Sequence, residues 1–207
     1  MSIAKQTKEY IQKNPSIVDC FKLGIINYSA LSRLICDYYK IKNFEAVLIS
    51  CRRIMYGLKD KEIHQKKIVS LLKSSKIRIR NKMLVAIIEK PRDMEKLYSF
   101  QKKIRKDKGD INLIEGEDVI TIITNLEYEE KVKELFSLRL IKLQKNLVQL
   151  TLVFNEKIEE TSGVVSYVYG LLAQNGINIK EEMSCWTDLM LIIEGKDMAK
   201  ATEILTW

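Results

Sequence analysis

The chain contains 207 residues, of which 46% are hydrophobic and 30% are charged. This is the composition of a folded globular protein, and the length suits two or three small domains. The sequence has no apolar run of about 18 residues, which a membrane-spanning helix needs, and its N-terminal segment has no apolar signal core. We therefore expect a cytoplasmic protein without a membrane segment.

The formal net charge of +8 is concentrated in one part of the chain. Residues 1–75 contain 14 Lys and Arg against 6 Asp and Glu, whereas residues 76–207 contain 21 of each kind. A basic segment joined to a neutral one predicts a polyanionic partner, such as DNA, for the first segment only. The alternative is a lysine-rich surface that is merely solvated.

The cysteines and the single histidine show no pattern of metal ligands. No two cysteines have the spacing of zinc ligands, and His64 is the only histidine. We expect neither a metal nor a cofactor, and we expect the thiols to be reduced and mostly buried. The four cysteines are Cys20, Cys36, Cys51 and Cys185.

Residues 1–75 have helical periodicity. Within residues 28–39, the apolar side chains that recur at the spacing of one helix face are Leu31, Leu34, Ile35 and Tyr38. Asn43 can cap a following helix, whose apolar face contains Val47, Leu48, Cys51 and Met55. A helix, a short turn and a second helix form the layout of a helix-turn-helix.

In such an arrangement, the helix after Asn43 would read DNA. The candidate nucleic-acid-binding residues lie just before this helix and on its outward face: Lys40, Lys42, Asn43, Arg52 and Arg53. Reading helices contact bases mainly through their N-terminal residues, and Glu45 occupies that end here. A basic helical module for dimerisation or docking is therefore the alternative.

From Lys76 onward, strands and helices alternate. The expected order is a strand at 76–90, a helix with Pro91 in its first turn, strands at 111–115 and 118–124, a helix capped by Asn125, and a strand at 138–144. The order then repeats as a strand at 146–154, a helix at 162–175, strands at 177–186 and 189–195 joined at Thr187-Asp188, and a helix at 197–205. The second repeat lacks a clear final strand.

This element order predicts an α+β fold. A βαββαβ unit is the split βαβ arrangement of ferredoxin-like folds, in which two helices cover one face of an antiparallel sheet. We predict a basic, helix-turn-helix-like domain at 1–75, a first ferredoxin-like unit at 76–145 and a second at 146–207.

The stretch around Gly163 has the residues that a strand-to-helix turn needs. Gly163 permits a backbone turn that other residues disfavour, and Thr161 or Ser162 can cap the helix. Gly176 can end the helix in a left-handed conformation. These residues can therefore be explained by the fold alone.

The same stretch also suits a small ligand. The start of a helix presents unpaired backbone N–H groups, so a carboxylate could bind near Gly163 and Val164. Asn178 on the adjacent strand offers a donor and an acceptor, and Glu160 could accept from an ammonium group. A carboxylate pocket beside an ammonium partner predicts a free amino acid as the ligand.

Residues 147–207 resemble an ACT domain, a small amino-acid-sensing module of regulatory proteins. The resemblance is carried by Gly163-Val164, the following helix, the Asn175–Ile179 junction and the closing helix at 197–205. It implies a ligand between the strand–helix loop of one unit and the second strand of a neighbouring unit, and it implies a homodimer. The implied ligand-binding residues are Glu160, Thr161, Ser162, Gly163, Val164 and Asn178.

Some residues depart from the family pattern. Glu160 stands where serine-sensing members have an amide, and Ile158 stands where they have a polar ring, which leaves the ligand's identity open. Residues 83–144 resemble the fold by element order only. Because the segment Lys90–Asp93 replaces the glycine turn there, we expect no ligand in that unit. The whole chain resembles archaeal proteins that join a helical segment to tandem ACT-like units.

The sequence gives little support for an enzyme. The glycine-rich phosphate loops GxxxxGK[ST] and GxGxxG are absent from the sequence. Glu181 and Glu182 occupy successive strand positions, so they should point to opposite sheet faces rather than form an acid/base pair. We expect Trp186 to be a packing residue.

The sequence therefore predicts a non-catalytic regulatory protein. It would sense a small effector, an amino acid, and couple this signal to a basic module that binds DNA. The alternative is a dimeric interaction protein that regulates a partner enzyme without binding DNA. RNA binding has less support, because the sequence lacks an aromatic-rich strand motif for base stacking.

Overall fold

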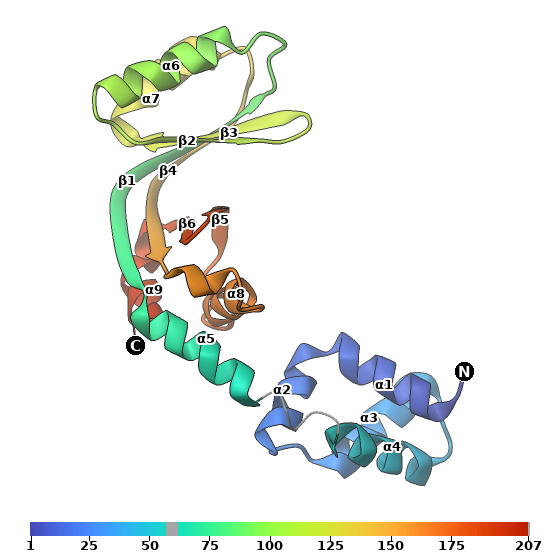
Figure 1. Ribbon diagram of the computed structural model, residues 1–207. Helices are drawn as coiled ribbons and strands as arrows, with labels where there is room; N and C mark the ends of the chain where they lie inside the picture. Colours follow the sequence, from blue (N-terminus) through green and yellow to red (C-terminus); the bar gives the residue numbers. More distant parts are fainter. Residues whose placement is uncertain (57–61, 207) are drawn as a thin grey trace. The chain divides into compact units, whose positions relative to one another are not determined.

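The structure is a computed structural model that describes residues 1–56 and 62–206 (Figure 1). The chain divides between Lys67 and Ile68 into two compact units. The α+β class is confirmed, with helices in the first unit and an antiparallel sheet with helices in the second. Among the described residues, no helix is long and apolar enough to cross a membrane.

The N-terminal unit is helical. Its helices are α1 (Ile3–Lys13), α2 (Pro15–Leu23), α3 (Tyr28–Tyr39) and α4 (Phe44–Tyr56), and α5 (Glu62–Ser74) continues past the division into the second unit. The core of the unit consists of Ile11, Phe21, Leu31, Ile35, Val47 and Cys51. The expected apolar face of α4 is confirmed for Val47, Leu48 and Cys51, whereas the side chain of Met55 lies outside the described residues.

The predicted apolar face of α3 was partly wrong. Leu31 and Ile35 are buried, but Leu34 is 56% and Tyr38 is 68% exposed. The buried face is turned towards Ser32, which can be buried because its hydroxyl donates to the carbonyl oxygen of Tyr28 at 2.7 Å. Because its hydroxyl has a hydrogen-bond partner, Ser32 can lie in the core. Hydrophobicity alone predicted Leu34 and Tyr38 on the buried face instead.

The C-terminal unit contains one six-stranded antiparallel sheet in the order β2-β3-β1-β4-β6-β5. Its strands are β1 (Lys76–Glu89), β2 (Ile111–Glu115), β3 (Val119–Asn125), β4 (Leu140–Val153), β5 (Ile179–Cys185) and β6 (Asp188–Glu194). Its α-helices after α5 are α6 (Glu95–Lys106), α7 (Glu129–Phe136), α8 (Val164–Gln174) and α9 (Met198–Leu205). Short 3-10 turns are η2 (Leu126–Tyr128), η3 (Glu156–Ile158) and η4 (Gly195–Asp197).

Two long strands, β1 and β4, connect the two halves of the sheet. The segments predicted as separate strands at 138–144 and 146–154 are one continuous strand, β4, so that prediction was wrong. The second half of β1 pairs with β3 and with the start of β4, whereas its first half, Lys76–Arg80, pairs with the end of β4. The second predicted repeat lacked a final strand. The first half of β1, which pairs with the end of β4, lies in that place.

Two of the three register shifts between β1 and β4 occur near residues with left-handed backbone. Lys82 has φ of 55° and Asn146 has φ of 58°, and the pairing of β1 with β4 is irregular between Arg80 and Val85. Such irregularities bend strands and increase their twist. Figure 1 shows both strands bending along their length, so the two halves of the sheet differ in orientation.

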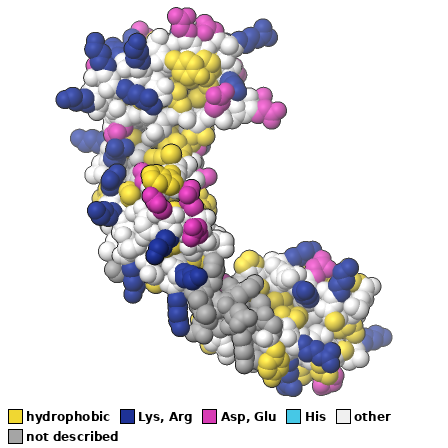
Figure 2. Space-filling model, viewed as in Figure 1, with side chains coloured by type: hydrophobic (Ala, Val, Ile, Leu, Met, Phe, Trp, Pro, Cys, Tyr) yellow, Lys and Arg dark blue, Asp and Glu magenta, His cyan; other side chains and the backbone are white. Residues whose placement is uncertain are grey.

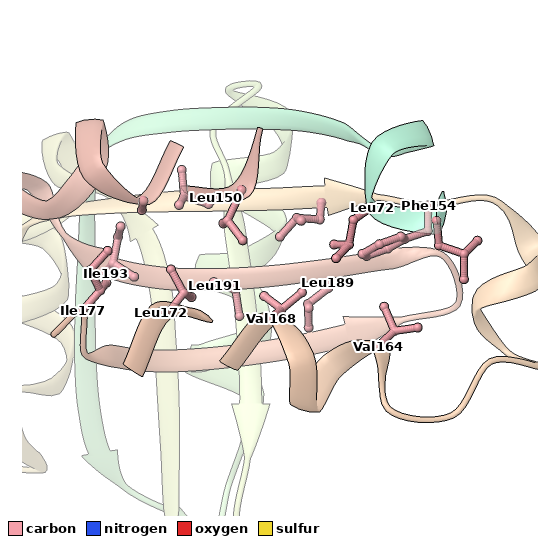
Figure 3. Close-up of a cluster of buried hydrophobic side chains, with 14 of the residues drawn as sticks. Leu72, Leu150, Phe154, Val164, Val168, Leu172, Ile177, Leu189, Leu191 and Ile193 are labelled. Carbon is pink, nitrogen blue, oxygen red and sulfur yellow. The ribbon is translucent and has the colours of Figure 1, made fainter. Parts of the chain in front are cut away.

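Each half of the sheet has its own helix-covered core. Helices α6 and α7 contribute Leu97, Phe100, Ile104, Val132 and Phe136 to a cluster with β1 and β3. Helices α5, α8 and α9 cover the other half, where side chains of α8 face those of β6 (Figure 3). On the opposite face of the sheet, a smaller cluster contains Met83, Val85, Ile123, Leu147 and Ile192.

Several local predictions need correction. Pro91 is not in the first turn of a helix, because α6 begins at Glu95, whose N–H donates to Oδ1 of Asp93 at 2.9 Å. Asn125 does not cap a helix with its side chain; its Oδ1 instead accepts from the N–H of Asp110 at 2.7 Å.

The hairpin after β5 also differs from the prediction. The turn consists of Trp186 and Thr187, one residue earlier than expected. Trp186 has φ of 50° and is 63% exposed, so it is not a packing residue. Of the four cysteines, Cys51 is buried, Cys20 and Cys36 are half-buried and Cys185 is exposed, so the thiols are not mostly buried.

Candidate functional site

The loop before α8 is shaped by Gly163. This residue has φ of 84°, a left-handed conformation that favours glycine, and it is the N-cap of α8. Gly163 is itself the N-cap residue and has no side chain, and Thr161 Oγ1 donates to the carbonyl oxygen of Lys157 at 2.8 Å. The predicted N-cap position at Thr161 or Ser162 was therefore wrong, because the helix is preceded directly by Gly163.

The predicted ligand residues in this loop differ in accessibility. Glu160, Ser162 and Gly163 are exposed, Thr161 is half-buried and Val164 is buried. Val164 belongs to the same buried cluster as Phe154 and Leu72, as Figure 3 shows. Its side chain anchors α8 to the core, so only its backbone is available to a ligand.

Asn178 lies at the other end of α8. It is exposed and comes after the left-handed Gly176, which ends the helix as expected. At about 1.5 Å per residue, the 11 residues of α8 span about 16 Å, so one chain does not bring Asn178 to Gly163. Asn178 precedes β5, which is an edge strand of the sheet and therefore has one side unpaired within the chain.

The candidate loop is connected to α5. Nδ2 of Asn155, at the start of the loop, donates to Oγ of Ser74 at 3.3 Å, at the end of α5. Beneath this contact, Phe154 and Val164 share a buried cluster with Ile68 and Leu72 of α5. The position of the loop and that of α5 are therefore linked through one core.

The two adjacent glutamates of β5 do point to different sides, as expected. Oε2 of Glu182 accepts a hydrogen bond from the hydroxyl of Tyr169 in α8 at 2.6 Å, and burial together with this bond raises the pKa of Tyr169. Glu181 is half-buried, and its burial raises its pKa despite the positive charge of Lys142. These carboxyl groups have separate environments and do not form an acid/base pair.

Glu194 forms the centre of a charged group at the end of β6. Its carboxylate pairs with Lys180 Nζ at 2.8 Å and with Lys196 Nζ at 2.7 Å. Hydrogen bonds from these two ammonium groups lower the pKa of Glu194 to about 2. The group links β5, β6 and η4 at the surface.

The predicted nucleic-acid-binding residues are all exposed on the N-terminal unit. Asn43 caps α4 as expected, because its Oδ1 accepts from the N–H of Ala46 at 3.1 Å. Lys40 and Lys42 lie close to this cap, and Lys40 ends α3 with φ of 56°. Arg52 and Arg53 lie near the other end of α4, about 15 Å along the helix. The basic residues therefore form two groups instead of one.

Sequence reasoning missed a basic cavity at the start of α6. The cavity has a volume of about 670 Å³ and is lined by the segment Lys90–Asp93, the first turn of α6 and the connection from α7 to β4. A sequence signal was present, because residues 90–108 contain eight Lys and Arg but three Asp and Glu. Acidic residues elsewhere in 76–207 balance this local excess, so the net charge of that segment does not reveal it. Among the described residues, no group of His, Cys, Asp and Glu could hold a metal ion.

No protein-family model matches the sequence, and comparison with curated proteins gives no match either. Solved structures, in contrast, show a clear similarity of fold. The regulatory subunit of aspartate kinase from Thermus thermophilus, in its ligand-free form, matches with a TM-score of 0.52 at 11% identity. The match covers 65% of this chain and 95% of that subunit.

Two complete aspartate kinases match over a smaller share of their length. The enzyme from Clostridium acetobutylicum has a TM-score of 0.53 at 13% identity, covering 62% of this chain and 33% of that one. The enzyme from Synechocystis has a TM-score of 0.51 at 15% identity, covering 62% and 26%. The chain therefore matches only about a third or less of each complete enzyme, but nearly all of the regulatory subunit. These similarities support an ACT-type fold for the matched part.

Proposed function

We propose that this chain is a non-catalytic regulatory protein that senses an amino acid and couples this signal to a basic DNA-binding module. The fold similarity to a regulatory subunit supports the first part of the proposal. The observation that carries it is the packing of the Gly163 loop. Val164, next to the exposed loop, is buried with Leu72 of α5, so an effector at the loop would act on a helix that continues into the basic unit.

The proposed effector site needs two copies of the chain. Glu160, Thr161, Ser162, Gly163 and the backbone of Val164 would come from one copy, and Asn178 from the other. Support comes from the length of α8, which separates the two parts within one chain, and from β5, which is free to pair at the sheet edge. We interpret the sheet as two ferredoxin-like units that share β1 and β4, and the homodimer would pair the second of these.

The proposed output is DNA binding through residues 1–75. Lys40, Lys42 and Asn43 at the start of α4 would contact DNA first, and Arg52 and Arg53 would add phosphate contacts. An effector changes this output only if it binds two arrangements of the protein with different affinity. In this proposal, α5 transmits the difference, since its last turns pack in the core beneath the effector loop.

Thermal unfolding of the full chain with each of the twenty amino acids tests the sensing function. A ligand that binds only the folded state stabilises it by about 2.7 kcal/mol at a hundred times its dissociation constant. We expect one amino acid to raise the melting temperature. The shift should be lost in Gly163→Ala and in Asn178→Ala, and each variant is compared with its own ligand-free melting temperature.

Gly170→Ala is the matched control for the glycine substitution. Gly170 lies within α8, and a Cβ there meets nothing within 4 Å, so the ligand-induced shift should persist. Gly163→Ala also strains the backbone, because Gly163 is left-handed. Asn178→Ala avoids this strain, because Asn178 is exposed and its φ is not positive, so it tests the loss of ligand contact alone. If no amino acid shifts the melting temperature, the sensing proposal fails.

DNA binding is tested separately by a mobility shift at several salt concentrations. Binding through phosphate contacts weakens steeply as salt rises, and Lys42→Gln with Arg53→Gln should reduce this dependence. The alternative is an interaction protein that regulates an enzyme, and the exposed Leu34 and Tyr38 on α3 favour it. Absence of DNA binding, together with a partner lost on Leu34→Ser, would support that alternative.

A further inference from the structure

The basic cavity at the start of α6 has the size of a small-molecule site. Its volume of about 670 Å³ lies within the range of about 300–1,000 Å³ that is usual for ligand pockets. The cavity lies in the first half of the C-terminal unit, far along the chain from the Gly163 loop. Figure 2 shows Lys and Arg side chains gathered at the end of the C-terminal unit that contains α6 and α7.

The acidic side chains of the cavity are already engaged. Asp93 accepts a hydrogen bond from the N–H of Glu95 at 2.9 Å, and Glu134 pairs with Lys131 at 2.7 Å. One cation is engaged too, because Lys90 pairs with Glu115 at 2.7 Å and donates to the carbonyl oxygen of Gly116. Lys131 therefore balances the charge of Glu134, whereas Asp93 keeps its negative charge.

Three exposed cations line the cavity wall: Arg92, Lys96 and Arg139. In the part of the chain that the structure describes, none of the three makes an ion pair. Gathering like charges without a counterion is unfavourable, so a bound anion would relieve their repulsion. Two of the three are arginines, whose planar group can donate two parallel hydrogen bonds to one anion.

The backbone around these cations is held in place. The N–H of Arg139 donates to the carbonyl oxygen of Phe136 at 2.8 Å, and its carbonyl accepts from Glu89 at 2.8 Å. On the other side, the N–H of Lys90 donates to Asp118 at 2.9 Å. The backbone of Arg139, and that of Lys90 two residues before Arg92, is therefore held before a ligand arrives, which lowers the entropy lost on binding.

We infer that this cavity binds the phosphate group of a small organic phosphate monoester. Arg92, Lys96 and Arg139 against Asp93 leave an excess of two positive charges, which a phosphate dianion matches better than a single carboxylate does, and the hydroxyl of Ser137 offers a further donor. Apolar side chains complete the wall, among them Leu138, which is 99% exposed. Leu138 would contact an apolar body attached to the phosphate.

Calorimetric titration of the full chain with phenyl phosphate tests the inference. Benzoate serves as a carboxylate with the same ring, benzyl alcohol as a neutral analogue, and inorganic phosphate as the anion alone. We expect phenyl phosphate to bind most tightly, benzoate more weakly and benzyl alcohol not at all. Arg92→Gln and Arg139→Gln should each weaken phenyl phosphate binding about tenfold, as loss of a charged hydrogen-bond partner does.

Two further variants distinguish a built site from general positive charge. Arg105 is an exposed residue of α6 that lies outside the cavity, so Arg105→Gln should leave binding of phenyl phosphate unchanged. Arg139→Lys keeps the charge but loses the paired donors, so it should weaken binding nearly as much as Arg139→Gln. Melting curves of the ligand-free variants establish that each is folded.

Three results would overturn the inference. Equal binding by the wild type and by the Arg92 and Arg139 variants would exclude the cavity, and tighter binding of benzoate would exclude phosphate. Displacement of phenyl phosphate by a DNA duplex would make the cavity part of a polyanion-binding surface instead. Because Asn178→Ala leaves the cavity intact, phosphate binding should persist in that variant, so this test is independent of amino-acid sensing.

Discussion

Ile79 in β1 lies directly opposite Leu150 in β4, although β2, β3, α6 and α7 lie between them in the chain. This pairing puts the first half of β1 next to the core that α5, α8 and α9 cover. Leu150 is fully buried in that core, and Ile77, two residues before Ile79, packs against it. The second half of the sheet thus depends on a strand that precedes the first half in sequence.

Substitution of Ile77 tests this shared strand. Ile77→Thr keeps a β-branched side chain but places a hydroxyl against the core, so we expect a loss of about 1–2 kcal/mol in the free energy of unfolding. Ile141→Thr in β4 is the matched control, because Ile141 is 57% exposed and should tolerate the change within about 0.5 kcal/mol. Urea denaturation measures both, and equal losses would contradict the strand pairing.

Leu72 should contribute strongly to the stability of the C-terminal unit. It is buried in the cluster with Phe154 and Val164, so Leu72→Ala should cost about 2–5 kcal/mol through lost burial and a residual cavity. The neighbouring Lys73 is exposed, and Lys73→Ala should be nearly neutral. Chemical denaturation, monitored by circular dichroism, measures the free energy of unfolding of both variants. A small effect of Leu72→Ala would mean that α5 is not anchored in this core.

A side chain at Gly195 would meet the backbone of β4. A Cβ there would lie 2.8 Å from the carbonyl oxygen of Asn146, so Gly195→Ala must displace one of the two segments and should cost about 1–3 kcal/mol. Gly170→Ala in α8 meets no neighbour and should stabilise the protein by about 0.5–1 kcal/mol, since alanine favours helices. Opposite shifts in melting temperature would confirm this difference, and a stable Gly195→Ala variant would refute it.

The ion pairs of Glu194 predict a pH-dependent contribution to stability. Lys180 and Lys196 lower its pKa from the ordinary value of 4.5 to about 2 in the folded protein. Because the folded state binds its proton less readily than the unfolded state, the stabilisation is complete above pH 4.5 and is lost as the pH falls through about 2.

Melting temperatures of the wild type and of Glu194→Gln, measured across this pH range, check the prediction. The difference between them should be constant above pH 4.5 and should shrink towards pH 2. Glu117→Gln is the control, since Glu117 is an exposed turn residue with no ion pair in the described part of the chain. A difference that stays constant down to pH 2 would show that the ion pairs do not act on stability.

Much of the local structure was predictable because it depends on neighbouring residues. The caps at Asn43 and Gly176, the left-handed Gly163, and the order of strands and helices after Lys76, apart from the division of β4, follow from short-range preferences. The candidate loop at Glu160–Val164 could be located for the same reason. The position of its N-cap was predicted wrongly, because the N-cap is Gly163, and Thr161 donates to the carbonyl oxygen of Lys157, a local alternative that residue type alone does not resolve.

The sequence by itself determined the element types, the α+β class and which residues alternate between faces, since periodicity and turn chemistry are local properties. Only the tertiary structure decided that Lys76–Arg80 pairs with the end of β4, and that Arg92 and Arg139 line one cavity. Strand pairing and cavity formation join segments far apart in the chain, and their register depends on bends at residues such as Lys82 and Asn146. Such contacts leave no periodic signal in the segments that they join.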